Sequence, residues 1–227
     1  MSNNKLKINL KDCTTTKEKL VKVTQHLLAS YGYEATSVRL IADYADVSLS
    51  AISFHFGSKE KLVHSAVQKA ADDLRISFGT YTEEIRSFAN GTDQDRDQAW
   101  QYLDRFLEEH INHIFNPKYS SLYIGLVSQE NGFPKSCQGI LSKAVVEQSE
   151  KVLVQLIALV MPEPNMFQAA IAARCIIAAI MSYMEKPILN KELEKAVGVN
   201  LEDSHEVAVF MHHYFMSSLH SFVESAA

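Results

Sequence analysis

A short run of hydroxyl and imidazole side chains between residues 48 and 55 has the composition of a surface that could contact nucleic-acid bases. Ser48, Ser50, Ser53 and His55 carry hydrogen-bonding groups, and Leu49 adds an apolar side chain. Serine hydroxyls can bond to base edges, and apolar side chains can contact a thymine methyl group. If this run lies in the major groove of DNA, we expect side chains 49–53 to contact base edges.

Polar and basic residues on both sides of the run could hold it against a phosphate backbone. Arg39 precedes it and Lys59 follows it. Such cations chiefly neutralise phosphates and position a protein on the duplex. Each residue could equally be a helix cap or an ordinary surface residue. The predicted DNA-contacting residues are Ser37, Arg39, Ser48, Leu49, Ser50, Ser53, His55 and Lys59.

Two helices joined by a tight turn must position these side chains. Ser37 is a candidate N-cap for a first helix, whose inward face repeats at helical spacing through Val38, Ile41, Ala42 and Ala45. Asp46 tolerates turn conformations, Val47 is apolar enough to fill the corner, and Ser48 can cap a second helix. That second helix runs from about Leu49 to Phe54 and turns Ala51 and Ile52 inward. A unit this small cannot bury a core alone, so an exposed second helix in a major groove is a sensible use for it.

The region from Thr16 to Val63 resembles the N-terminal domain of the TetR family of bacterial transcriptional regulators. The matching features are the runs 29–39 (ASYGYEATSVR) and 55–62 (HFGSKEKL), with Ile41, Ala42, Ala45, Val47 and Ser48 between them. The resemblance implies an all-α fold, a helix-turn-helix that binds DNA, and a C-terminal domain that binds a small-molecule effector and dimerises.

Within that family, residues 51–60 (AISFHFGSKE) are most similar to the CecR-like regulators. Ser53 and Phe54 stand where that subgroup has Asn and Tyr. The change at position 54 removes a hydroxyl that could bind phosphate, and Ser53 has a shorter reach than Asn. Asp46 replaces a frequent turn glycine, and Leu49 occupies a place that is often basic or polar.

The composition predicts an all-α globular protein. The chain has 227 residues, 47% of them hydrophobic and 22% charged, which is enough to bury a sizeable core. Its apolar residues repeat mostly at helical spacing. Residues 1–61 hold nine Lys or Arg against six acids, a net charge of +3, so the remainder carries −8 of the total of −5. A mildly basic head on an acidic body fits a DNA-binding domain joined to a regulatory domain.

Three domains are expected: a polar N-terminal arm at 1–15, a DNA-binding domain at 16–62, and a ligand-binding and dimerisation domain at 63–227. The arm carries Lys5, Lys7 and Lys11, and could either touch phosphate or be a frayed, solvated tail. Gly32 is placed to end the first helix. Further helices are expected at about 59–78 or beyond, 94–115, 120–130 and 136–161.

Two helices, at about 165–185 and 203–225, are expected to close the chain. Both are apolar nearly all round, which a surface helix of a monomer would not be. By the family resemblance, they would form a four-helix interface between two subunits. A symmetric dimer would present two recognition helices to a palindromic operator. The run 166–184 contains Gln168 and Arg174, so we expect a buried helix there and no membrane span.

The sequence indicates the effector-binding residues less clearly than the DNA-contacting residues. Arg174 lies among Ala and Ile residues and needs a partner, which could be an anionic effector or a structural acid such as Glu147. Apolar and aromatic residues on the central helices could line a cavity or be plain core. The candidate ligand-binding residues are Phe106, His110, Tyr123, Phe133, Phe167 and Arg174.

Other functional classes have weaker support in the sequence. His110, His113, His212, His213, Cys137 and Cys175 could serve a metal- or redox-responsive regulator, but no compact Cys/His signature is present, and we predict no metal and no cofactor. Motifs for an all-α enzyme are absent, namely a phosphate loop, a Gly-x-Ser-x-Gly elbow and His-Glu-x-x-His. Three widely spaced cysteines and no signal-like segment favour a reducing, cytoplasmic location. The sequence therefore favours a dimeric DNA-binding regulator, most simply a repressor.

Overall fold

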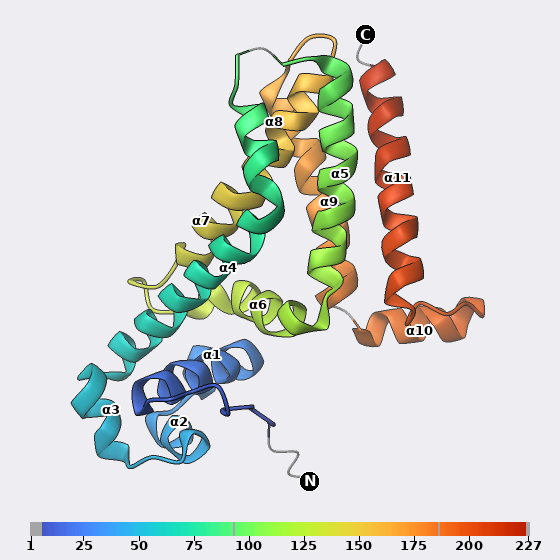
Figure 1. The fold of residues 1–227 in the computed structure, drawn as a ribbon. Helices are drawn as coiled ribbons and strands as arrows, with labels where there is room; N and C mark the ends of the chain where they lie inside the picture. Colours follow the sequence, from blue (N-terminus) through green and yellow to red (C-terminus); the bar gives the residue numbers. More distant parts are fainter. Residues whose placement is uncertain (1–5, 93, 186, 226–227) are drawn as a thin grey trace. The chain divides into compact units, whose positions relative to one another are not determined.

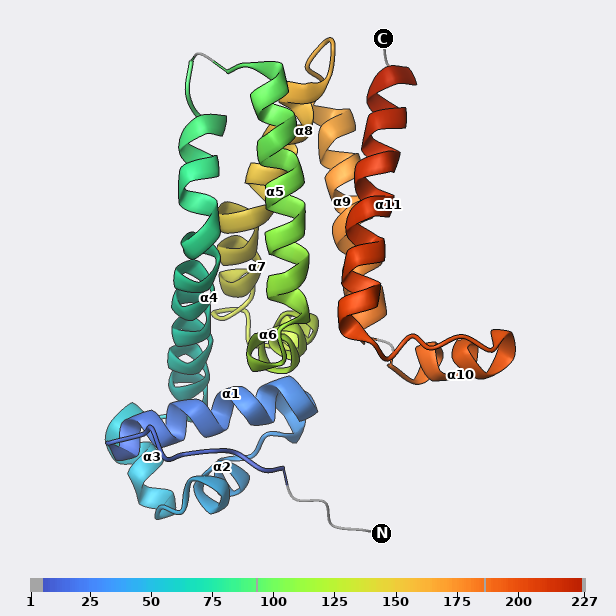
Figure 2. The same cartoon turned by 45° about the vertical axis from the view of Figure 1, so that its right-hand side comes forward.

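A computed structural model describes residues 6–92, 94–185 and 187–225, and every regular element in these ranges is helical (Figures 1 and 2). The predicted all-α class is therefore confirmed. The α-helices are α1 Thr16–Ala35, α2 Val38–Ala45, α3 Leu49–Phe56, α4 Lys59–Ala89, α5 Arg96–Phe115, α6 Pro117–Gln129, α7 Ile140–Val145, α8 Lys151–Val160, α9 Met166–Glu185, α10 Pro187–Val197 and α11 Ser204–Ser225. A 3₁₀ turn, η1 (Glu130–Gly132), follows α6, and a π-helical turn, η2 (Val146–Glu150), follows α7.

The chain forms two compact units, and three helices pass from one to the other. Unit 1 contains residues 1–74 and 121–144, and unit 2 contains residues 75–120 and 145–227. The crossings fall within α4, α6 and α7. The functional boundaries predicted at 15/16 and 62/63 are a separate matter and stay predictions.

Unit 1 is built on one apolar core shared by its first four helices. Its buried members are Leu20, Val23, Leu27, Ile41, Ala42, Ala45, Ile52, Phe56 and Leu62. The buried Gln25 side chain of α1 donates from Nε2 to the carbonyl oxygen of Ala66 on α4, at 2.9 Å. This bond satisfies a buried amide and joins the first helix to the fourth.

The segment 121–144, which is remote in sequence, packs against α1 within the same unit. A Cβ atom at Gly125 of α6 would lie 2.9 Å from the carbonyl oxygen of Ala29 and 3.0 Å from its Cβ. A side chain at position 125 would force the two helices apart, so glycine permits this close approach. Gly32, at φ +74° and ψ 179°, interrupts the helical backbone where the first helix was predicted to end, but α1 continues beyond it to Ala35.

Unit 2 is a packed set of long helices. Figure 1 shows α11 lying alongside α5; α11 also contacts α9, and α8 packs against both α5 and α9. Arg96 at the start of α5 donates from Nε to the carbonyl oxygen of Val160 at the end of α8, at 2.8 Å. Arg86 of α4 donates to Gln148 in the π-helical turn, at 2.8 Å.

The helix predicted at 136–161 is wrong, because the chain is broken there. Gly139 adopts φ +81°, and α7 begins only at Ile140. The buried Glu130 carboxylate accepts from the backbone N–H groups of Leu141 (2.7 Å) and Ser142 (3.0 Å). A side chain distant in sequence thus satisfies the unpaired donors of this helix start. The π-helical turn then separates α7 from α8.

Helix α10 was not predicted. Pro187 supplies a φ angle suited to the first helical position, and Gly198, at φ +71°, follows its last turn. No residue of α10 is buried, and Ile188, Leu189, Leu193 and Val197 are all exposed. Burial therefore does not explain why α10 forms. The residues at its two ends, Pro187 and Gly198, explain where it begins and ends.

Helix α9 is long and apolar enough to cross a membrane by length and composition. Its most apolar 18-residue window has a mean hydropathy of 1.5, and 28% of that window is buried. A core helix of a soluble protein meets the same criteria, so this property does not make α9 a membrane span. The buried residues of α9 form one stripe, Ala169, Ala173, Ile176, Ile177 and Ile180.

Candidate nucleic-acid interface

Helix α2 begins and packs as its sequence predicts. The Ser37 hydroxyl accepts from the backbone N–H of Leu40 at 3.1 Å, so Ser37 is the N-cap. Ile41, Ala42 and Ala45 are buried, and Val38 packs against the same core. Arg39 lies in the first turn with its side chain exposed, as a phosphate contact requires.

A left-handed residue makes the turn between α2 and α3. Asp46 has φ 54° and ψ 53°, and in the described chain it is the only non-glycine residue with a positive φ. Short polar side chains tolerate this region better than most residues. Val47 packs partly against the core, so the predicted apolar corner is also confirmed. The left-handed residue ends α2 and lets the chain change direction before α3 begins at Leu49.

Helix α3 buries two residues and exposes nearly all the others. Ile52 and Phe56 are buried in the unit 1 core, one helical turn apart. The exposed residues are Leu49, Ser50, Ser53, Phe54 and His55, with Leu49 55% exposed. An apolar anchor on one face and hydrogen-bonding groups on the other suit a helix that enters a groove.

Ser48 stands at the N-cap position of α3, but its hydroxyl does not cap the helix. The Ser48 Oγ lies 2.9 Å from the Ser50 Oγ, and no side-chain capping bond is formed. Thr16, at the start of α1, lines a shallow hollow together with Ser48, Ser50, Phe54 and His55. The N-terminus of α1 therefore borders the exposed face of α3.

Lys59 is engaged inside unit 1, whereas a free phosphate contact was expected from the sequence. Its Nζ donates to the carbonyl oxygen of Tyr33 at 2.8 Å and lies 3.8 Å from the centre of the Tyr33 ring. Partial burial lowers the pKa of Lys59. The Tyr33 carbonyl oxygen, near the end of α1, also accepts from the Thr36 backbone N–H at 3.2 Å, so Lys59 supplies its second hydrogen bond.

Phe54 was not among the predicted contacts, although it is the most exposed large apolar residue of α3. Its side chain is 84% exposed, and its ring packs edge-on against His55 at 5.0 Å between centroids. An aromatic ring in this position can make apolar contacts with sugars or thymine methyl groups. The signal was available in the sequence, since position 54 lies two residues from the buried Ile52.

Residues 6–14, which we call the strap, pack against the head, by which we mean helices α1, α2 and α3. Leu6, Ile8 and Leu10 pack against the unit 1 core, while Lys7, Asn9 and Lys11 are exposed. The frayed-tail alternative is therefore wrong for residues 6–14. Residues 1–5, including Lys5, lie outside the described part of the chain.

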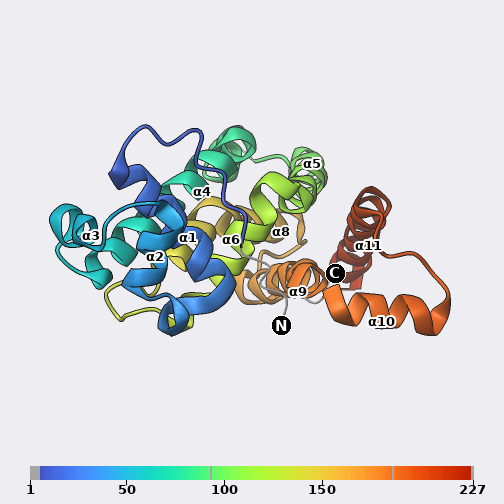
Figure 3. The same ribbon diagram turned by 90° about the horizontal axis from the view of Figure 1, so that it is seen from below.

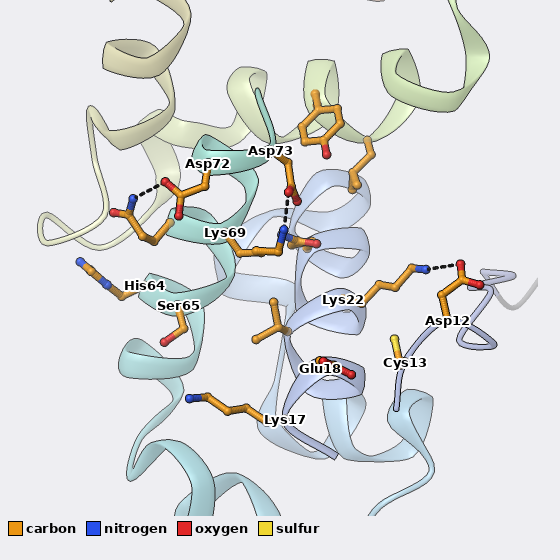
Figure 4. Close-up of a pocket in the computed structure, with 15 residues that line it drawn as sticks. Asp12, Cys13, Lys17, Glu18, Lys22, His64, Ser65, Lys69, Asp72 and Asp73 are labelled. Carbon is orange, nitrogen blue, oxygen red and sulfur yellow. Dashed lines mark hydrogen bonds and ion pairs between the residues drawn. The ribbon is translucent and has the colours of Figure 1, made fainter. Parts of the chain in front are cut away.

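The predicted ligand residues are divided between the two units, and their role as one site stays a prediction. Phe106 and His110 are buried neighbours on α5, with ring centroids 5.2 Å apart. Tyr123 lines a separate open groove of about 760 Å³ in unit 1, bordered by Lys17, Lys22 and Lys69 and by Asp12, Glu18, Asp72 and Asp73 (Figure 4). Phe133 is buried in unit 1, and Phe167 on α9 is 75% exposed.

Arg174 is paired, but with a different acid from the one named. Its NH1 nitrogen contacts the Glu150 carboxylate at 2.6 Å, whereas Glu147 was expected. The Arg174 side chain is 62% exposed, so the ion pair lies at the surface of unit 2. Glu147 and Glu150 both lie in the π-helical turn, which the sequence pattern did not predict.

His110 and His113 contact protein groups within unit 2. The Tyr81 hydroxyl lies 2.7 Å from His110 Nδ1, and the Ser77 hydroxyl lies 3.0 Å from His113 Nε2. Burial, aided by the neighbouring His113, lowers the pKa of His110 to about 3. Among the described residues, no group of three or more His, Cys, Asp or Glu side chains could hold a metal ion.

The fold and the exposed α3 define an all-α protein with a helix-turn-helix head. Sequence comparison extends this description, because the family described as bacterial regulatory proteins, tetR family, matches residues 20–66. A 68-residue stretch is 38% identical to the HTH-type transcriptional repressor KstR2 of Rhodococcus jostii (strain RHA1). That match covers 30% of this chain and about a third (32%) of the repressor's length.

Solved structures resemble the chain over most of its length. PfmR, a TetR family transcriptional regulator from Thermus thermophilus, superposes with a TM-score of 0.56 at 18% identity, covering 87% of this chain and 97% of that one. The fatty acid degradation regulator FadR from Bacillus halodurans gives a TM-score of 0.55 at 15% identity, covering 91% and 97%. At these identities the likeness concerns the fold. Residues 20–66 thus match the model of the tetR family, and the chain as a whole shares the fold of solved TetR family regulators.

Proposed function

We propose that this protein is a transcriptional repressor that binds a palindromic operator as a homodimer and leaves it when a small-molecule effector binds. The observation that carries the proposal is α3, a helix anchored by Ile52 and Phe56 whose other side chains are largely exposed. Residues 16–62 would be the DNA-binding domain and residues 63–227 the effector-binding and dimerisation domain. Repression is inferred by analogy with the relative named as a repressor, and the protein would act in the cytoplasm.

In this proposal α3 enters the major groove. Ser50, Ser53, Leu49 and Phe54 would contact base edges, with His55 at their border. Arg39 would contact phosphate, and Ser37 and Ser48 flank the groove at the two helix starts. The engagement of Lys59 with Tyr33 argues for a positioning role for this residue, in which it holds the end of α1 in place.

Dimerisation through α9 and α11 is supported by the apolar side chains that these helices leave exposed. Phe167 and Ile171 on α9 are exposed, as are Phe210 and Tyr214 on α11, whose rings stack 6.0 Å apart. Isolated apolar residues are common on surfaces, but contiguous ones favour an interface. A two-fold dimer would place two copies of α3 on half-sites roughly 34–36 Å apart.

Release by an effector would depend on the helices that continue from one unit into the other. A ligand that binds better to a conformer of unit 2 with mismatched heads would weaken operator binding by the ratio of its two affinities. Helices α4, α6 and α7 are the covalent routes for such a change. The buried cluster of His110, Tyr81 and Phe106 brings aromatic and hydrogen-bonding groups together within unit 2.

The decisive experiment is selection of genomic DNA fragments by the purified full-length protein, repeated with two arginine variants. We expect a short palindrome that Arg39→Ala fails to enrich. Arg105→Ala is the matched control, because it removes an exposed arginine of α5 that is paired with Glu84 and Glu109. Diffuse binding that neither variant changes would contradict the proposal.

A second measurement tests the dimer. The double variant Phe210→Ser/Tyr214→Ser should sediment as a monomer and lose most of its operator affinity, while exposed His205→Ser should leave both unchanged. A wild-type protein that sediments as a monomer and still binds the palindrome tightly would overturn the dimer.

A further inference from the structure

The strap, residues 6–14, packs along the head and contains a turn, closed by a hydrogen bond from the Cys13 N–H to the Leu10 carbonyl oxygen at 3.1 Å. Its burial alternates along the chain, with Leu6, Ile8 and Leu10 half-buried against the unit 1 core and Lys7, Asn9 and Lys11 exposed. Successive side chains of an extended segment point to opposite sides. The apolar residues therefore turn Lys7 toward solvent, and Lys11 is exposed in the turn that follows Leu10.

Hydrogen bonds hold the strap at both ends. The backbone N–H of Leu6 donates to the Tyr44 hydroxyl of α2 at 3.2 Å. At the other end, Glu18 accepts from the backbone N–H groups of Thr14 (2.7 Å) and Thr15 (3.1 Å), and the bonds from Thr14 are the main reason for its lowered pKa. Between them, Asp12 pairs with Lys22 of α1 at 3.8 Å (Figure 4).

Both ends of the strap border the helix-turn-helix. Tyr44, which binds Leu6, lies two residues before the Asp46 turn that leads into α3. Thr16, just after the other end, lines a hollow with Ser48 and His55. Figure 3 shows the strap running beside α1 and α2. The residues on either side of Lys7 and Lys11 therefore adjoin the elements proposed to contact DNA.

The proposed interface is short of cations at its centre. Helix α3, residues 49–56, contains no Lys or Arg, and Lys59 is bound to Tyr33. Sequence-specific binding still relies on several phosphate contacts, which supply a large share of the affinity. In the part of the chain that the structure describes, neither Lys7 nor Lys11 forms an ion pair.

We propose that the strap is a second DNA-binding element, in which Lys7 and Lys11 contact the phosphate backbone beside the base pairs that α3 reads. The ligand is the phosphodiester backbone of double-stranded DNA. Because phosphates carry no sequence information directly, the strap adds affinity and salt dependence and leaves the preferred sequence unchanged. This inference rests on the proposed function, since it assumes that α3 contacts DNA.

The test compares Lys7→Gln/Lys11→Gln with the wild type on the selected palindrome, over a series of salt concentrations. Each lost phosphate contact reduces the slope of log affinity against log salt by about 0.9, so we expect a reduction of roughly two for two lysines. At about 0.1 M salt the affinity should fall by roughly tenfold or more. Urea unfolding of the variant should match the wild type, because both side chains are exposed.

A matched control separates a contact from a general effect of charge. Lys135→Gln/Lys151→Gln makes the same charge change at two other exposed lysines and should keep the wild-type slope. Equal loss of slope in both double variants, or no change in the strap variant, would overturn the strap proposal. Either result leaves the proposed function standing if the wild type still selects a palindrome that Arg39→Ala loses. Failure of the wild type to select any sequence would instead remove the proposed function.

Discussion

The Nζ of Lys59 lies 2.8 Å from the carbonyl oxygen of Tyr33 and 3.8 Å from the centre of the Tyr33 ring. One cation thus adds a second hydrogen bond to a carbonyl near the end of α1, which also accepts from the Thr36 N–H, and packs on the aromatic side chain of the same residue. Lys59 begins α4, so this contact joins the end of the first helix to the start of the fourth. These contacts give Lys59 a stabilising role in the head that does not depend on DNA binding.

Lys59→Gln should therefore destabilise the protein by about 1–2 kcal/mol, since it removes a charge-assisted hydrogen bond and a cation–π contact from a half-buried site. Lys61→Gln, two residues later and exposed, should change stability by less than about 0.5 kcal/mol. Urea denaturation of both variants provides the comparison. Equal stability of the two variants would show that the Tyr33 contact contributes nothing measurable.

Ser37 and Ser48 stand at the N-caps of neighbouring helices but differ in their hydrogen bonds. Because only the Ser37 hydroxyl accepts from its own helix, Ser37→Ala should cost about 1 kcal/mol, whereas Ser48→Ala should stay within about 0.5 kcal/mol. Thermal unfolding without DNA measures both. A larger loss in Ser48→Ala than in Ser37→Ala would contradict the capping assignment.

Gly125→Ala should destabilise unit 1 by about 1–3 kcal/mol, because its new methyl group would meet the backbone of Ala29 at 2.9 Å and the backbone cannot easily retreat. Gly79→Ala is the control, since nothing lies within 4 Å of a Cβ there. Gly79 is inside α4, where alanine should stabilise by up to about 1 kcal/mol. The prediction requires opposite signs in urea unfolding, and two stabilised variants would contradict it.

Acid should weaken the fold through His110. Its folded pKa of about 3 lies below the usual value of 6.5, so as pH falls through 6.5 the unfolded chain takes up a proton that the folded chain does not. The stability it provides is complete above 6.5 and is lost towards pH 3. Between about pH 7.5 and about pH 5.0 this group should remove about 2 kcal/mol of unfolding free energy.

His110→Gln is the variant that tests this linkage, with exposed His205→Gln as its control. The His110 variant should be less stable at the higher pH, because it loses contacts with Tyr81 and Phe106, but it should lose less stability on acidification. Urea unfolding at the two pH values gives the difference. Parallel losses in the wild type and in His110→Gln would rule out a buried, neutral His110.

Local chemistry along the chain is enough to predict the helix-turn-helix. Ser37, Asp46 and the spacing of Ile41, Ala45 and Ile52 act within a few residues of one another, so their caps, turn and inward faces can be read directly. The strap shows the limit of this reading. Its alternation of Leu6, Ile8 and Leu10 was present in the sequence, but only packing against the core distinguishes the strap from a solvated tail.

What the sequence by itself determined is therefore the all-α class, the helix-turn-helix and the family resemblance, because helix caps, a left-handed turn and apolar spacing are local properties. Tertiary structure decided the partners of long polar side chains. Lys59 reaches Tyr33, Glu130 caps the start of α7, and Arg174 pairs with Glu150. These contacts depend on where distant backbone segments meet, and a flexible side chain bonds to whichever compatible group lies within its reach.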